Sequence, residues 1–98
     1  MPVFLVGYDL RHGTEDEYSE LIETIKKISA SWWHCLDSTW LIVHQGPASA
    51  IRDALGPHLQ LPDDQRRGDK LLVARLEKGA AWTTSFNDNC RGWLREHL

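Results

Sequence analysis

The chain has 98 residues, the size of one domain. Hydrophobic residues make up 42% and charged residues 26%, which excludes a disordered tail, a collagen-like repeat and a coiled coil. The net charge of −3 means that any contact with nucleic acid has to rest on a local basic patch or on a metal ion. The sequence has no apolar run of membrane-spanning length and no signal peptide, which predicts a cytoplasmic protein.

The first half of the chain has the pattern of a strand, a helix and a hairpin. Residues 2–10 form an apolar run of strand length. Thr14 and Glu17 have the spacing of a capping box, so we expect a helix to begin there. Two short strands are predicted over residues 32–36 and 39–44, with a two-residue turn between them. The predicted helix carries apolar side chains at helical spacing: Tyr18, Leu21, Ile22, Ile25 and Ile28.

The second half has the pattern of a helix, a strand and a final helix. Pro47 after Gly46 predicts the first turn of the second helix. Residues 60–69 form a polar loop, and residues 70–76 are predicted as a strand. Asn87 is expected to cap the last helix. The apolar face of that helix holds Phe86, Cys90, Trp93, Leu94 and His97.

This element order predicts an α+β fold. It fits a ferredoxin-like βαββαβ sandwich, in which the first and last strands are neighbours in one antiparallel sheet and two helices cover one face. We expect a single domain over residues 1–98, with the βαββαβ core at 1–76 and a C-terminal helical extension at 77–98.

The predicted strands are apolar on both faces, although two helices can cover only one face of a sheet. The second face, with Val3, Leu5 and Gly7, is therefore buried by the C-terminal helix or by a second copy of the chain. We expect a homodimer, because closed twofold dimers are the commonest oligomers.

Cysteine and tryptophan carry two further expectations. Cys35 and Cys90 are too few and too isolated for a disulfide framework or a zinc site, so we expect buried thiols. Trp32 and Trp33 are adjacent in a predicted strand and point to opposite faces, so one belongs to the core and the other to the surface or an interface. His34 beside them fits a structural role better than that of a general base.

Asp9 is the residue most suited to chemistry. It ends an apolar strand on the face assigned to the dimer, where a carboxylate is costly unless it is solvated, hydrogen-bonded or bound to a metal. Two Asp9 side chains facing each other across a dimer axis could hold Mg²⁺. The alternative is that Asp9 caps the loop at residues 10–14 or pairs with Arg11.

The run Val6-Gly7-Tyr8-Asp9-Leu10 resembles the V-x-Y-D-[IL] opening of the CRISPR-associated protein 2 family, whose members are small ferredoxin-like dimers. Ser38 before an apolar strand resembles the third strand of that family. Nearly the whole chain is similar to a group of short bacterial proteins that carry the SinR-family name. That second similarity rests on residues 7–10, 32–34, 36–40 and 69–73.

The resemblance implies a divalent-metal-dependent endonuclease acting on RNA or DNA. It implies that Asp9 holds Mg²⁺ or Mn²⁺ between protomers, and that Tyr8 and Ser38 lie near the nucleic acid. Arg11 and His12 follow Asp9 and are the catalytic side chains expected near the scissile phosphate. The alternative is a non-catalytic homodimer that binds nucleic acid or another protein, which the acidic net charge favours.

Overall fold

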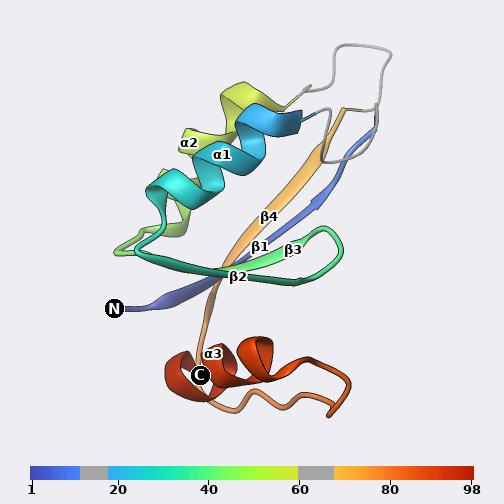
Figure 1. Ribbon diagram of the computed structural model, residues 1–98. Coiled ribbons are helices and arrows are strands. Elements are labelled where there is room, and N and C mark those ends of the chain that lie inside the picture. Colours follow the sequence, from blue (N-terminus) through green and yellow to red (C-terminus); the bar gives the residue numbers. More distant parts are fainter. Residues whose placement is uncertain (12–17, 60–67) are drawn as a thin grey trace.

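The computed structural model describes residues 1–11, 18–59 and 68–98 (Figure 1). Its centre is a four-stranded antiparallel sheet with the strand order β2-β3-β1-β4. The strands are β1 (Val3–Asp9), β2 (Ser31–Leu36), β3 (Thr39–Val43) and β4 (Lys70–Leu76). Helices α1 (Ser19–Ile28) and α2 (Ala48–Leu55) lie on one face of the sheet, and α3 (Asp88–His97) lies on the other. A short 3-10 turn, η2 (Gly56–His58), continues α2.

The sheet confirms the α+β class and the predicted pairing of the first and last strands. β1 lies at the centre and pairs antiparallel with β4 along its whole length, from Val3 opposite Leu76 to Asp9 opposite Lys70. The strand predicted over residues 70–76 has the bounds that the structure shows. The capping box predicted at Thr14 and Glu17 lies outside the described residues. Among the described residues, no helix is long and apolar enough to cross a membrane.

The main core lies between the sheet and the pair α1 and α2. β1 sends alternate side chains to this side, because successive residues of a strand point to opposite faces. One apolar edge of each helix meets them, as the spacing of the apolar residues predicted. The buried residues of this core are Phe4, Val6, Tyr8, Tyr18, Leu21, Ile25, Trp40, Ile42, Ile51 and Leu55.

A second, smaller core lies between the sheet and α3. Asn87 caps α3 as predicted, since its side-chain oxygen accepts a hydrogen bond of 2.9 Å from the backbone N–H of Cys90. Leu94 packs against the other face of β1 and β3. The C-terminal helix, rather than the second copy that we favoured, therefore covers the part of the second face that contains Val3 and Leu5. The buried residues of this core are Val3, Trp33, Leu41, Val43 and Leu94.

Cys35 and Cys90 form a disulfide, so the prediction of two buried thiols is wrong. Cys35 belongs to β2 and Cys90 to α3, and their Cα atoms are 6.3 Å apart. Sequence spacing did not indicate the pair, because the two residues are separated by 55 positions and meet only when α3 packs on the sheet. The bond fastens α3 to the edge strand of the sheet.

Two tryptophans add polar links between β2 and α3. The indole N–H of Trp33 donates to the carbonyl of Cys90 at 3.1 Å, and that of Trp93 donates to Ser31 Oγ at 2.8 Å. Trp33 is buried on this side, whereas Trp32 points to the helix side and is 43% exposed. The predicted division of the two adjacent tryptophans between core and surface is confirmed.

Candidate functional site

The candidate site lies where β1 ends, beyond the part of the sheet that α3 covers. The register places Leu36, Thr39, Gly7 and Leu72 in one row across all four strands, and we call these residues the open row. Directly opposite residues of an antiparallel pair point to the same face, so the open row lies on the α3 side. Leu72 is 65% exposed and Leu36 is 48% exposed. The two leucines at the ends of the open row are thus exposed, whereas Gly7 and Thr39 between them are half-buried.

Asp9 and Lys70 form the next pair beyond the open row. They are the last register partners of β1 and β4 and share the α3 side of the sheet. Both are exposed. The desolvation argument for a metal at Asp9 therefore does not apply within one chain, because water reaches the carboxylate. A second copy that covered this position would restore the need for an ion or another partner for the carboxylate.

Arg11, the predicted basic partner of Asp9, is held in place through its backbone. The N–H of Arg11 donates to Asp69 Oδ1 at 2.7 Å, and the Tyr18 hydroxyl donates to the same oxygen at 3.1 Å. Asp69 is only 6% exposed. Asp69 directly precedes β4, so its two hydrogen bonds connect the start of β4 to the end of β1 and to the start of α1. The Arg11 residue itself is exposed.

Asp69 was missed by the sequence analysis, which placed it in the polar loop at 60–69. The available signal was its position, since an aspartate directly before an apolar strand can accept hydrogen bonds from neighbouring chain ends. The sequence alone could not single out Asp69, because the same loop also contains Asp63 and Asp64, which have the same side chain.

Tyr8 and Ser38 meet through the backbone rather than through their side chains. The N–H of Tyr8 donates to the carbonyl of Ser38 at 3.0 Å, which places the β2–β3 turn beside the end of β1. The Tyr8 ring is buried on the helix side, and its hydroxyl accepts a hydrogen bond of 2.8 Å from Trp40 Nε1. Ser38 is exposed in the turn, with a positive φ of 56°. The structure thus puts the side chains of Tyr8 and Asp9 on opposite faces of the sheet.

The described residues hold no cluster of metal ligands around Asp9. His12 lies outside the described residues. In the described part of the chain, no group of three or more His, Cys, Asp or Glu side chains is placed to hold a metal ion. Asp9 supplies one carboxylate, whereas protein-bound Mg²⁺ takes one or two carboxylates plus waters and substrate oxygens. Within residues 1–11, 18–59 and 68–98, a resident ion at Asp9 finds no group of three such ligands, so a second copy is one source of a further carboxylate.

His34 packs into an aromatic stack near the turn. Its ring lies parallel to that of Trp40, with centroids 4.0 Å apart and an angle of 5° between the planes. The Thr39 carbonyl accepts a hydrogen bond of 3.0 Å from His34 Nδ1. The ring centroids of Trp32 and Trp40 are 5.2 Å apart, and Lys26 Nζ lies over the Trp32 ring. These contacts support the structural role that the sequence favoured for His34.

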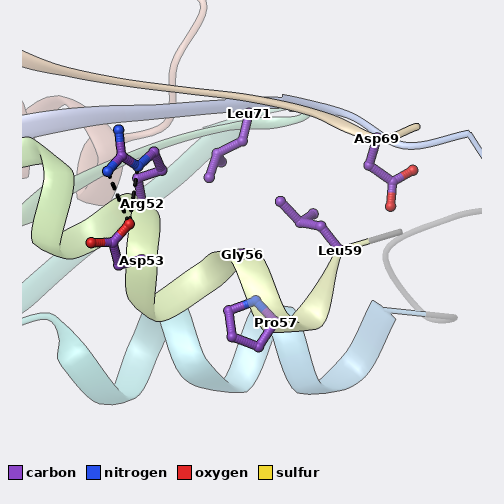
Figure 2. A pocket seen from close by; sticks show the side chains of 7 residues that line it. All are labelled: Arg52, Asp53, Gly56, Pro57, Leu59, Asp69 and Leu71. Carbon is purple, nitrogen blue, oxygen red and sulfur yellow. Dashed lines mark hydrogen bonds and ion pairs between the residues drawn. The ribbon is translucent and has the colours of Figure 1, made fainter. Parts of the chain in front are cut away.

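A cavity of about 600 Å³ lies on the helix side, between α2 and the start of β4. Figure 2 shows Leu59 and Leu71 between its two polar ends, with Asp69 at one end and the Arg52–Asp53 pair at the other. Arg52 Nε donates to Asp53 at 3.0 Å, and Asp69 takes the two bonds described above. The charged groups of the cavity are thus engaged with one another or with the chain, and Asp9 does not line it.

A scan against family models finds no match for the chain, and searches of curated proteins and of solved structures also find none.

Proposed function

We propose that the chain is a ferredoxin-like, cytoplasmic, homodimeric module that holds nucleic acid without cutting it. One observation carries the dimer: Leu36 and Leu72, at the two ends of the open row, are exposed apolar side chains on the same sheet face that α3 covers farther along. Large apolar side chains that are exposed on the same sheet face favour an interaction surface. The observed strand order supports the ferredoxin-like assignment, since each βαβ unit places one strand of the other unit between its own two.

The nucleic-acid part of the proposal rests on the side chains beside the open row. Arg11 and Lys70 are both exposed at the end of β1 and the start of β4. In a dimer Arg11, Lys70 and the neighbouring carboxylate of Asp9 are all doubled, which leaves a small local excess of basic groups on a chain of net charge −3. The resemblance to the CRISPR-associated protein 2 family, some of whose members bridge DNA, supports the same reading.

Sedimentation velocity tests the dimer. We expect a concentration-dependent dimer for the wild type and a monomer for Leu72→Lys, because an unpaired ammonium buried in the interface is costly. Arg75→Ala is the matched control, since Arg75 is an exposed residue of the same strand on the helix side. A wild type that stays monomeric, or a Leu72→Lys variant that still dimerises, would refute this interface.

The second candidate is a Mg²⁺- or Mn²⁺-dependent endonuclease for RNA or DNA. It is favoured by Asp9, an exposed carboxylate with Arg11 two residues further along the chain and Lys70 opposite in register. Asp9 would hold the ion, and the basic side chains would face the phosphate. The assay is cleavage of labelled single- and double-stranded RNA and DNA with each metal, for the wild type and Asp9→Ala. Cleavage that is lost in an intact Asp9→Ala dimer would replace the non-catalytic proposal, whereas absent cleavage leaves the binding module.

A further inference from the structure

Trp32 is a surface aromatic side chain that neither the main core nor the open row explains. It lies on β2, an edge strand of the sheet, and faces the helix side next to the end of α1. The residue is 43% exposed, although tryptophan is highly buried on average. A surface tryptophan is typical of binding sites, because its large, stiff ring buries much apolar area at a low cost in conformational entropy.

The ring of Trp32 rests on an ordered aromatic group. Its centroid is 5.2 Å from that of Trp40, and the two planes are tilted by 55°, so the Trp40 ring does not stack flat on it. Trp40 is buried, donates a hydrogen bond of 2.8 Å to the Tyr8 hydroxyl, and stacks on His34. A ligand that stacks on Trp32 therefore meets a surface that is already in place, which keeps the cost of ordering low.

Two lysines in the last turn of α1 place positive charge beside this ring. Lys26 Nζ lies 5.2 Å from the centroid of the Trp32 ring. Lys27 follows it and is exposed. Glu23 Oε1 lies 3.9 Å from Lys26 Nζ, but both side chains reach solvent, so the ion pair contributes little. The end of α1 thus carries a local excess of basic groups on a chain of net charge −3.

We propose that Trp32 and Lys26 form a binding site for single-stranded nucleic acid. One base stacks on the Trp32 ring, and the Lys26 ammonium moves from the ring to the adjoining phosphate. Lys27 adds a second positive charge along the strand. The inference rests on the proposed binding of nucleic acid but does not need the dimer. It adds a surface at β2, whereas Arg11 and Lys70 lie toward the opposite edge of the sheet.

The exchange of a cation for a base on the ring favours binding. An exposed cation–π contact changes an equilibrium by about two- to fivefold, whereas a base stacked on an aromatic side chain changes it by about five- to 150-fold. The ammonium keeps an interaction partner throughout, because a phosphate oxygen takes the place of the ring. Stacking and charge therefore act together at one short segment of the strand.

The chemistry favours a single strand over a duplex and over a protein. In a duplex each base is stacked between its neighbours, so its face is not open to Trp32. In a single strand the faces of the bases are free, and every base can stack on an aromatic ring. A protein partner fits less well, because lysine is depleted at protein interfaces and here lies directly over the ring.

The test uses single strands of thymidine and of uridine, each of roughly 15 nucleotides, and a DNA duplex of the same length. Anisotropy of a fluorescein label gives the dissociation constant Kd, and quenching of tryptophan emission by unlabelled strands reports contact with an indole ring. We expect both single strands to bind the wild type about tenfold or more tightly than the duplex, and to quench its emission.

The variants separate stacking from charge. Trp32→Ala should weaken the binding of either single strand by about tenfold or more. Trp32→Phe keeps a ring and should bind within about threefold of the wild type, but with most of the quenching lost. Lys26→Ala should lower the slope of log Kd against log salt by about 0.7, the value for one phosphate contact on a single strand. Lys78→Ala, the matched control, removes an exposed lysine beyond the end of β4 and should leave the slope unchanged.

Each contrary outcome counts against a defined part of the argument. Binding that leaves tryptophan emission unchanged, survives Trp32→Ala or favours the duplex overturns this site. The proposed function still stands if that binding is lost in Arg11→Ala/Lys70→Ala. A higher dimer dissociation constant for Trp32→Ala in sedimentation velocity would assign the ring to a protein interface instead. If Trp32→Ala does not fold, quenching of Trp32→Phe equal to that of the wild type overturns the site. A wild type that binds none of the strands overturns both the site and the proposed binding of nucleic acid.

Discussion

Among the described polar residues, the buried Asp69 is the side chain whose loss we expect to be most costly. Its carboxylate is buried and accepts hydrogen bonds from the Arg11 N–H and the Tyr18 hydroxyl. Asp69→Ala leaves both donors without this acceptor, and each unsatisfied buried group costs about 1–3 kcal/mol. We therefore expect the free energy of unfolding in urea to fall by about 2–4 kcal/mol. Asp69→Asn keeps one carbonyl acceptor and should cost less than the alanine.

Asp53→Ala is the control for this measurement. Asp53 is also an aspartate beside the helix-side cavity, but it is exposed and pairs only with Arg52 on the surface. Exposed ion pairs contribute about 0–1 kcal/mol, so we expect a small change. An Asp69→Ala variant as stable as Asp53→Ala would show that the network around Asp69 does not hold the end of β1 in place.

The residue scale also shows where sequence reasoning reaches its limit. The alternation of Trp32 and Trp33 followed from strand geometry, since neighbouring residues of a strand must point to opposite faces. The contacts of Asp69 and the pairing of Cys35 with Cys90 could not follow in this way. Each depends on residues 51 to 58 positions apart, and separation along a chain carries no information about distance in the fold.

At the scale of elements, the cap of α3 gives a sharp comparison between two asparagines. The Asn87 side chain accepts a hydrogen bond from the Cys90 N–H, whereas Asn89 in the same first turn is exposed. Asn87→Ala removes the cap and should cost about 1 kcal/mol, equivalent to about fivefold faster exchange of the α3 amides. Asn89→Ala, the control, should change exchange by less than about twofold, since alanine is a good helix former. Equal exchange in the two variants would mean that the cap does not limit the opening of α3.

Gly92 allows the opposite change in the same helix. A Cβ at Gly92 has no atom of the described residues within 4 Å, so Gly92→Ala fits without a clash. Alanine in a helix interior is about 0.5–1 kcal/mol more favourable than glycine, so we expect α3 amide exchange to slow about two- to fivefold. Faster exchange in Gly92→Ala would show that packing around α3 requires the glycine.

At the scale of the whole molecule, the sequence predicted how the strands pair, but not which segment covers the second face of the sheet. Element order and two-sided apolar strands predicted the strand pairing and the need for a layer on the second face. They could not say whether α3 or a second copy forms that layer, because both bury the same residues and leave the same pattern. In the structure, α3 covers the part of the second face that contains Val3, and the open row lies farther along the strands, past the end of that helix's contacts.

Because Asp9 lies on the part of the face that α3 leaves exposed, the metal dependence of dimer formation tests whether two Asp9 side chains share an ion. If two Asp9 side chains face each other across a dimer axis, they repel in the absence of an ion, and a shared Mg²⁺ stabilises the dimer. An ion that binds only the dimer strengthens it by mass action, by about tenfold when its free concentration is about ten times the site dissociation constant. We expect EDTA to weaken the wild-type dimer by that factor, and Mg²⁺ or Mn²⁺ to restore it.

Asp9→Asn separates this effect from general screening of charge. The variant removes both the repulsion and the ligand, so its dimer should form equally well in EDTA and in Mg²⁺. Lys70→Ala, the neighbouring substitution, keeps both carboxylates and should keep the response to the cation. All measurements are made by sedimentation velocity at one ionic strength, since salt alone screens exposed charges. A wild-type dimer that is indifferent to EDTA would show that the two Asp9 side chains share no ion, and the endonuclease candidate would then lose its metal site.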